Sequence, residues 1–326
     1  MILRDATPTE MVAVLGHTAP LWAEGLPLPS YSDWVQTLKD SAWGKADNMR
    51  FLVLVDEESG DVVSGMKLYR LSARLERSPV SVGGIGAVFT FTQHRAHGHA
   101  GTMISAAHRL MVERGDAFSL LYSDIGATYY ARLGYQEIDP RPVTLSVPDK
   151  GTSPSGVKRM HRTDLDTLLR LRQMEDEKTP FAILRNADYF RFLLARWSFP
   201  TLHHSPERWE SRVMLAGSEG YLWALFTRTG SEPGKARLME FAEVTPGAAL
   251  PALLDDLFAE CRRRDIKQLD AWMPPGRVAR DPRLADLITP ALSASAVPMW
   301  FPLDEESAAA MRRCTSGILL DLGDAF

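Results

Sequence analysis

The chain is poor in cysteine, has no excess of basic residues and contains no long apolar run. Only Cys261 and Cys314 occur in 326 residues, and neither lies in a spacing typical of metal or redox motifs. A formal net charge of -4 gives no basic field for nucleic acid or anionic lipid. No apolar stretch could span a bilayer, and the N-terminus MILRDATPTE lacks a signal-peptide core. We therefore expect a cytoplasmic protein with no nucleic-acid or membrane partner, of unknown oligomeric state.

The length and composition of the chain are those of a globular protein with two domains. Hydrophobic residues make up 45% of the sequence and charged residues 24%, which is ordinary for a globular protein. A chain of 326 residues exceeds the usual size of a single hydrophobic core. A stretch rich in proline, glycine and serine, without apolar periodicity, lies near residues 147–157. We therefore predict a first domain over residues 1–147 and a second over residues 157–326.

The most informative stretch is a strand, a tight loop and a helix between residues 81 and 111. The apolar strand Ser81–Thr90 leads into the loop Arg95–Gly101, and apolar residues then recur at the spacing of one helical face, at Met103, Ile104, Ala107, Leu110 and Met111. A helix that begins in such a loop leaves backbone N–H groups free to bind phosphate. Small residues in the loop let a bulky pyrophosphate approach the backbone. The stretch therefore predicts a site for a nucleotide-like anion.

Two motifs in this region resemble the signature of the GNAT superfamily of N-acetyltransferases. Arg95-x-x-Gly98-x-Ala100 resembles the Q/R-x-x-G-x-G/A loop, which in that family holds the pyrophosphate of acetyl-CoA. The run Tyr129-Tyr130-Ala131-Arg132-Leu133-Gly134-Tyr135 is similar to the family's F/Y-Y-x-x-L-G-F/Y ending. The resemblance implies an α/β (α+β) fold, with a mixed, mostly antiparallel sheet flanked by helices. It also implies that the first domain is a catalytic GNAT domain with the acyl-CoA site.

The remaining elements of the first domain follow the order that this resemblance requires. A capping box at Thr7–Glu10 predicts the start of a helix, and a second helix is expected over Tyr31–Lys39 with Ser30 or Ser32 as its cap. The expected strands are Ile2–Arg4, Phe51–Val55, Val62–Leu71 and Ala117–Tyr122.

The second half of the chain repeats this order of elements without repeating the motifs. Helices are expected after the cap Thr163–Asp166, over Asn186–Trp197 and over Ala248–Arg264, and strands over Val213–Leu215, Tyr221–Arg228 and Ala236–Val244. Glu243–Ala248 lacks the anion-loop signature, and Asp281–Pro302 lacks a Tyr-x-x-x-Gly ending. We expect a degenerate second GNAT-like copy that shapes the acceptor site; an unrelated α/β domain is the alternative. Tandem copies of which only the first keeps the signature resemble the N-terminal part of the bacterial aminoglycoside acetyltransferases of the enhanced-intracellular-survival type.

The resemblance assigns roles to residues of the first domain. The backbone of Val88, Phe89 and Thr90 would pair with the pantetheine arm of the cofactor. The loop residues Arg95, Ala96, His97, Gly98, His99, Ala100 and Gly101 would hold the pyrophosphate. Ser123 stands where the family often has Asn, which puts a CoA contact there in doubt. Tyr130 matches the tyrosine that protonates the leaving thiolate; for a lone tyrosine, packing in the core would be the alternative.

The base that accepts the proton of the acceptor amine is less well defined. Asp124, just past a strand end, is the first candidate, and Glu24, His94 or water are alternatives. His97, His99 and His108 also cluster near His94 in the sequence, but no carboxylate or cysteine completes a ligand set, so we expect no metal.

Three functions are consistent with these residues. The first is an N-acetyltransferase that uses acetyl-CoA as co-substrate and transfers the acetyl group to a primary amine of a small molecule or amino acid by direct attack. The second uses a different acyl-CoA or acyl thioester in a biosynthetic pathway, in acyl transfer or decarboxylation. The third is a non-catalytic CoA-binding protein, which the intact loop and Tyr130 disfavour.

Overall fold

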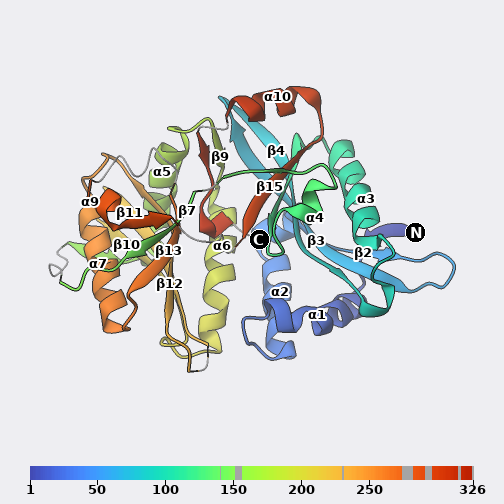
Figure 1. The fold of residues 1–326 in the computed structure, drawn as a ribbon, viewed down its shortest axis with the longest axis horizontal. Helices are drawn as coiled ribbons and strands as arrows, with labels where there is room; N and C mark the ends of the chain where they lie inside the picture. Colours follow the sequence, from blue (N-terminus) through green and yellow to red (C-terminus); the bar gives the residue numbers. More distant parts are fainter. Residues whose placement is uncertain are drawn as a thin grey trace. The chain divides into compact units, whose positions relative to one another are not determined.

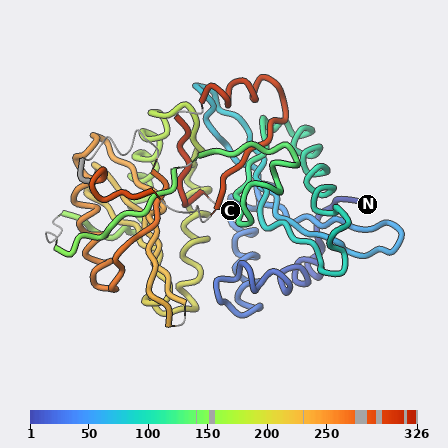
Figure 2. Tube along the Cα trace, in the orientation of Figure 1, coloured from blue at the N-terminus to red at the C-terminus, as the bar shows by residue number. Residues whose placement is uncertain are grey.

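The chain divides into two units, each built around its own sheet (Figures 1 and 2). The computed structural model describes residues 1–139, 141–150, 156–229, 231–273, 282–290, 296–314 and 317–324. The first unit consists of residues 1–138 and 296–313, and the second of the described residues from 139 to 290 together with 314 and 317–324.

The first unit is a mixed sheet flanked by helices. Its strands are β1 (Ile2–Asp5), β2 (Met49–Val55), β3 (Val62–Leu75), β4 (Ser78–Thr90), β5 (Phe118–Ser123), β6 (Gln136–Glu137) and β15 (Val297–Pro302). Its α-helices are α1 (Pro8–Trp22), α2 (Leu28–Lys39), α3 (His99–Glu113), α4 (Thr128–Ala131) and α10 (Glu305–Arg313). The strand order is β1-β2-β3-β4-β5-β15-β6, in which β4 and β5 are parallel and the other neighbours are antiparallel.

Helices α1 and α3 cover opposite faces of this sheet. A side chain at Gly65 of β3 would meet Val14 of α1 at 3.0 Å. The next residue along the strand, Met66, instead packs in a buried cluster with Met103 and Met111 of α3. Because successive side chains of a strand point to opposite faces, the two helices lie on the two sides of β3.

The helix starts are partly those that the sequence predicts. The capping box of α1 is confirmed, because Thr7 accepts from the N–H of Glu10 and the Glu10 carboxylate accepts from the N–H of Thr7. The predicted start of the second helix is wrong. Helix α2 begins at Leu28, and no side chain caps it. The residue before it, Pro27, has its φ fixed by the pyrrolidine ring, so the chain enters the helix here without a serine cap.

The second unit is built on the same plan. Its strands are β7 (Pro142–Ser146), β8 (Val157–Arg159), β9 (Phe181–Ile183), β10 (Trp209–Ala216), β11 (Gly220–Thr227), β12 (Lys235–Glu243), β13 (Gln268–Trp272), β14 (Ile288–Pro290) and β16 (Ile318–Leu319). Its α-helices are α5 (Leu165–Asp176), α6 (Ala187–Ser198), α7 (Leu250–Arg263) and α9 (Pro282–Leu287). The order of its main sheet is β8-β10-β11-β12-β13-β7-β14, again with one parallel pair, β12 with β13, in the middle.

The two units exchange one strand. In each sheet the strand next to the last comes from elsewhere in the chain: β15 stands between β5 and β6, and β7 stands between β13 and β14. The continuous ranges predicted from the sequence, 1–147 and 157–326, therefore differ from the observed units by residues 139–147, which include β7, and by residues 296–313, which include β15 and α10. Residues 151–155 of the predicted linker, and residues 281 and 291–295 near the predicted missing ending, lie outside the described residues. The predicted class, two mixed sheets flanked by helices, is confirmed.

Alternation along β11 explains how the second sheet is covered on both faces. Leu222, Ala224 and Phe226 pack in the buried cluster of α7, whereas Tyr221 and Trp223 contact Phe190 of α6.

Helix α5 begins differently from the start that the sequence predicts. A short 3-10 turn, Arg162–Asp164, precedes α5, and His161 rather than Thr163 caps that turn because its ring nitrogen accepts from a backbone N–H.

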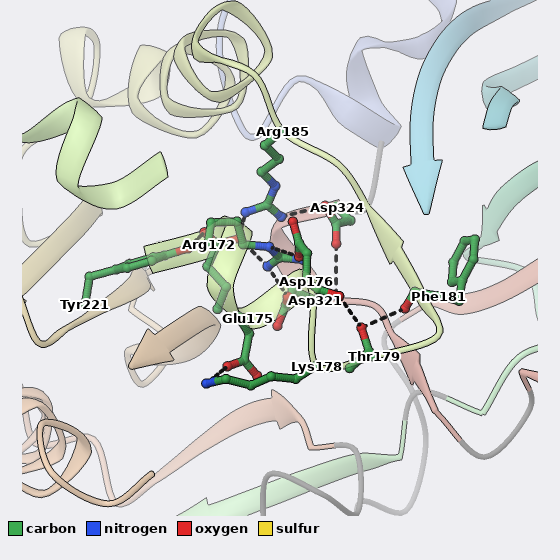
Figure 3. Close-up of polar contacts among 11 residues, drawn as sticks. Arg172, Glu175, Asp176, Lys178, Thr179, Phe181, Arg185, Tyr221, Asp321 and Asp324 are labelled. Atoms are coloured by element: carbon green, nitrogen blue, oxygen red, sulfur yellow. Dashed lines mark hydrogen bonds and ion pairs between the residues drawn. The ribbon is translucent and has the colours of Figure 1, made fainter. Parts of the chain in front are cut away.

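A buried ionic cluster fixes the last described residues of the chain in the second unit (Figure 3). Arg172 of α5 pairs with Asp176 and Asp321, and Arg185 pairs with Asp324 and with Glu240 of β12. All of these side chains are almost fully buried. Removing one partner of such a buried pair costs about 3–5 kcal/mol, because the other charge is left uncompensated. The cluster therefore holds the segment Asp321–Asp324 against α5 and β12.

Candidate active site

The first sheet opens between its two parallel strands. The pairing of β4 with β5 runs from Val82 opposite Phe118 to Ile85 opposite Leu121. Both strands continue past this point, β4 to Thr90 and β5 to Ser123. The strands therefore part, and among the described residues no strand pairs with the end of β4 on the side of the opening.

A β-bulge marks the place where β4 turns away. Its register with β3 shifts, so that Lys67 is opposite Gly86 whereas Gly65 is opposite Phe89, and Ala87 has a positive φ of 51°. Beyond the bulge the N–H of Phe91 donates to Val63 of β3. Because backbone groups alternate between the two edges of a strand, the polar groups of Val88 point to the opposite edge, into the opening.

The loop after β4 ends at an uncapped helix N-terminus. Gly98 precedes α3 with φ 78°, no side chain caps the helix, and the first helical bond runs from the N–H of Thr102 to the carbonyl of Gly98 (3.0 Å). The N–H groups of His99, Ala100 and Gly101 consequently have no acceptor within the helix. These groups and the helix dipole make this end of α3 suited to an anion, and the binding of an anion by the loop stays a prediction.

The reason for glycine at position 98 differs in part from the expected one. A Cβ added there would meet no atom within 4 Å, so the protein itself leaves room for a side chain. The requirement is the left-handed backbone, which a residue with a Cβ adopts at a cost of roughly 1 kcal/mol or more. A second reason for glycine, the close approach of a bound anion to the backbone, would arise only when an anion is present.

Arg95 and the histidines frame this helix end. The Nε of Arg95 donates to the carbonyl of Thr90 (3.1 Å), and its guanidinium lies over the ring of Phe89 (5.7 Å). Arg95 thus ties the loop back to the end of β4. The ring of His99 lies 6.3 Å from that of His94 and 5.9 Å from that of His97. Within the described residues, no group of histidine, cysteine and carboxylate side chains could hold a metal ion.

Tyr130 lies beside the uncapped end of α3. A side chain at Gly101 in the first turn of α3 would contact Leu133 at 3.5 Å, so the end of α4 packs against that turn. Burial raises the pKa of Tyr130 to about 12, with smaller contributions from Tyr129 and Asp124. Within the described residues, no protein group hydrogen-bonds the Tyr130 hydroxyl. The phenol therefore stays protonated near neutrality and is available to a ligand.

A packed aromatic group holds α4 in place. The Tyr130 ring meets Tyr135 edge to face, with ring centroids 5.9 Å apart. The Tyr135 hydroxyl is hydrogen-bonded to Ser119 (2.7 Å) and to His108 (2.8 Å). Burial lowers the pKa of His108 to about 4, so this imidazole is neutral. Gly134 is required here, because its φ is 90° and a Cβ would meet Phe301 of β15 at 2.9 Å.

The end of β5 carries the remaining predicted residues. The Ser123 hydroxyl donates to the carbonyl of Gly126 (2.6 Å), which closes the turn before α4. The carboxylate of Asp124 is exposed and accepts from the indole Nε1 of Trp22 (3.4 Å). The structure thus brings Asp124 near Tyr130. Glu24 follows Trp22 closely in the chain and is exposed.

Two contacts at this site had no usable signal in the sequence. The bond from Trp22 to Asp124 joins residues far apart in the chain. His17 of α1 contacts the rings of Phe89 (6.0 Å) and Phe91 (4.9 Å) at the end of β4. A histidine in a helix without a motif cannot be assigned to a site before the fold is known.

The site therefore combines three features. An open strand edge can hydrogen-bond an extended amide chain, an uncapped helix end can bind phosphate, and a protonated tyrosine can donate a hydrogen bond. A carboxylate lies near that tyrosine.

Comparison with known proteins identifies this arrangement. Residues 4–138 match the family model for the acetyltransferase (GNAT) domain. This match shows a GNAT acetyltransferase domain over these residues, and the second unit repeats the strand order of the first. A comparison with curated proteins finds no match.

Solved structures match almost the whole chain at low identity. A GCN5-related N-acetyltransferase from Kribbella flavida is 19% identical, with a TM-score of 0.62 over 94% of this chain and 73% of that chain. Eis1 from Mycobacterium abscessus is 14% identical, with a TM-score of 0.61 over 95% and 76%. Saccharomyces cerevisiae N-myristoyltransferase, solved with myristoyl-CoA, is 11% identical, with a TM-score of 0.61 over 98% and 85%. At such identity the likeness shows a shared fold alone.

The described helices include none that is both long enough and apolar enough to pass through a membrane.

Proposed function

We propose that this protein is an N-acetyltransferase that transfers the acetyl group of acetyl-CoA to a primary amine of a small molecule or amino acid. The observation that carries the proposal is the meeting of the open β4 edge, the uncapped end of α3 and the free Tyr130 hydroxyl in one unit. The two cysteines in 326 residues support a reducing compartment such as the cytoplasm.

The donor would lie along the parted strands. In this proposal the N–H groups of His99, Ala100 and Gly101 bind the pyrophosphate, with His97 beside it. The backbone of Val88 pairs with the amides of the pantetheine arm, as an added strand would. Binding the arm in this way points the thioester toward the end of β5, where Asp124 and Tyr130 lie.

The chemistry then requires a proton donor and a proton acceptor. The amine nitrogen attacks the thioester carbonyl, the C–S bond breaks, and the Tyr130 hydroxyl hydrogen-bonds the departing sulfur. Because the pKa of Tyr130 is raised to about 12, while a thiol has a pKa of about 8.5, complete proton transfer would be uphill. Tyr130 therefore acts chiefly by stabilising the developing thiolate, in the manner of an oxyanion hole. Asp124, oriented by Trp22, takes the proton that the amine loses.

The second unit has a different part in this proposal. The loop before α7 lacks the anion signature. We therefore propose that the second unit shapes the acceptor site. Catalysis stays with the first unit.

A donor and acceptor screen tests the proposed function. The protein is incubated with acetyl-CoA, longer acyl-CoA thioesters and free CoA, each with a panel of small amines and amino acids, and the acylated products are identified by mass spectrometry. We expect acetylated amines that depend on both acetyl-CoA and the enzyme. Products formed only from longer thioesters would transfer the proposal to another donor. Binding of CoA without any product would contradict the proposed reaction.

A further inference from the structure

The second unit keeps the geometry that forms the cofactor site in the first. Its parallel pair β12 and β13 ends at Leu238 opposite Ala271, although β12 continues to Glu243. The register of β11 with β12 shifts between Trp223 and Ala224, so a bulge stands next to the parting strands here as well. A helix, α7, again follows the parting strand. The second unit thus has an opened edge and a following helix end.

The helix end in this unit is already occupied by a carboxylate of the protein. Glu243, the last residue of β12, is 0% exposed. Its Oε1 accepts from the N–H of Gly247 (2.8 Å), and its Oε2 accepts from those of Ala249 (3.3 Å) and Leu250 (3.2 Å). Three backbone N–H groups at the start of α7 therefore converge on one anionic side chain.

The next residue removes a further donor. Pro251 stands in the first turn of α7 and has no N–H group. At the matching position of the first unit, β4 ends in Thr90, whose hydroxyl is hydrogen-bonded sideways to Ser64 (2.8 Å) rather than to the helix end. The difference between the units is thus a carboxylate in place of a hydroxyl, at the strand end that precedes the helix.

We propose that Glu243 is a built-in anion that fills the second unit's copy of the phosphate site and so restricts the chain to one acyl-CoA. A second negative group cannot enter, because the N–H groups are saturated and the buried carboxylate repels it. This inference rests on the proposed function for the statement about acyl-CoA. The occupancy of the helix end by the carboxylate stands on the hydrogen bonds alone.

Chemical rescue tests the occupancy. The variant Glu243→Ala removes the carboxylate and leaves a cavity lined by the three N–H groups, whereas Glu243→Gln keeps the shape and an acceptor oxygen. Melting temperatures of both variants and the native protein are measured in sodium formate and in sodium chloride of equal ionic strength. We expect Glu243→Ala to melt lower than the native protein, and formate to raise its melting temperature saturably. The native protein and Glu243→Gln should respond to formate as they do to chloride.

The same preparations separate this inference from the proposed function. A Glu243→Ala protein that formate does not stabilise, whether folded or not, overturns the assignment, as does an equal response in all three proteins. Calorimetric titration of the native protein with CoA should give one site per chain, and two equivalent sites would overturn the restriction. A native protein that binds no CoA would contradict the proposed function and leave the formate result valid.

Discussion

Tyr130→Phe removes a single hydroxyl group and leaves the aromatic ring in place. The ring packs edge to face against Tyr129 (5.1 Å) and Tyr135 (5.9 Å), and these contacts survive the change. Within the described residues no protein group loses a hydrogen-bond partner. We therefore expect the free energy of unfolding to change by no more than about 0.5 kcal/mol.

The effect on turnover should be much larger. If the hydroxyl stabilises the leaving thiolate, its loss should lower kcat by roughly 100-fold or more, the range of a positioned proton or hydrogen-bond donor. The KM for acetyl-CoA should change little, because the interaction is made in the transition state. The pKa of about 12 adds a second expectation. A solvated tyrosine is half ionised at about pH 10. Activity that depends on the protonated phenol of Tyr130 should therefore persist above that pH.

Steady-state kinetics and thermal melting on the same preparations provide the assay. Tyr129→Phe is the matched control, since Tyr129 is adjacent, is only partly buried and belongs to the same short helix. Its kcat should stay within a few-fold of the native value. A stable Tyr130→Phe enzyme with native kcat would refute the role of the hydroxyl and would leave water to stabilise the departing thiolate.

Three further predictions concern binding, folding and pH. Gly98→Val should abolish CoA binding measured by calorimetry, because a β-branched residue resists a φ of 78° and blocks approach to the helix end; undiminished affinity would contradict this. A fragment ending at residue 147 should lack a cooperative melting transition, because it loses Val297–Pro302, the partner of buried β5, and appending that strand through a flexible linker should restore the transition. Burial lowers the pKa of His108 in the folded protein to about 4, so on acidification the unfolded chain binds a proton at this histidine before the folded protein does. The free energy of unfolding should therefore fall as the pH drops from about 6.5 to 4, by on the order of 2 kcal/mol after solvent screening. Urea unfolding at both ends of that range should show a smaller loss in His108→Gln; an equal loss would refute the assignment.

The sequence carried the local features of the fold well. The glycine-containing loop before α3, the capping box of α1 and the apolar periodicity of α7 are properties of neighbouring residues, and each is seen in the structure. The repeated order of elements in the second half also predicted a second copy of the fold. These features depend on short-range backbone preferences that a single sequence records.

Long-range pairing could not be read in the same way. Nothing near Val297–Pro302 shows that this strand enters the first sheet, because its continuous apolar run would suit a central strand of either sheet. The bond between Trp22 and Asp124 and the cluster of Arg172 with Asp321 likewise join distant segments. The role of Glu243 was hidden for another reason: an acidic residue at a strand end looks like surface until three N–H groups are found around it.

The central claim is that the first unit alone binds acyl-CoA, along the open edge of β4 and at the start of α3. Amide hydrogen exchange measured with and without acetyl-CoA tests this claim most directly. The account predicts slower exchange over Val88–Thr90 and over His97–Gly101 when acetyl-CoA is present, and unchanged exchange over Gly247–Leu250. Protection confined to the second unit, or no change at His97–Gly101 under saturating acetyl-CoA, would contradict it.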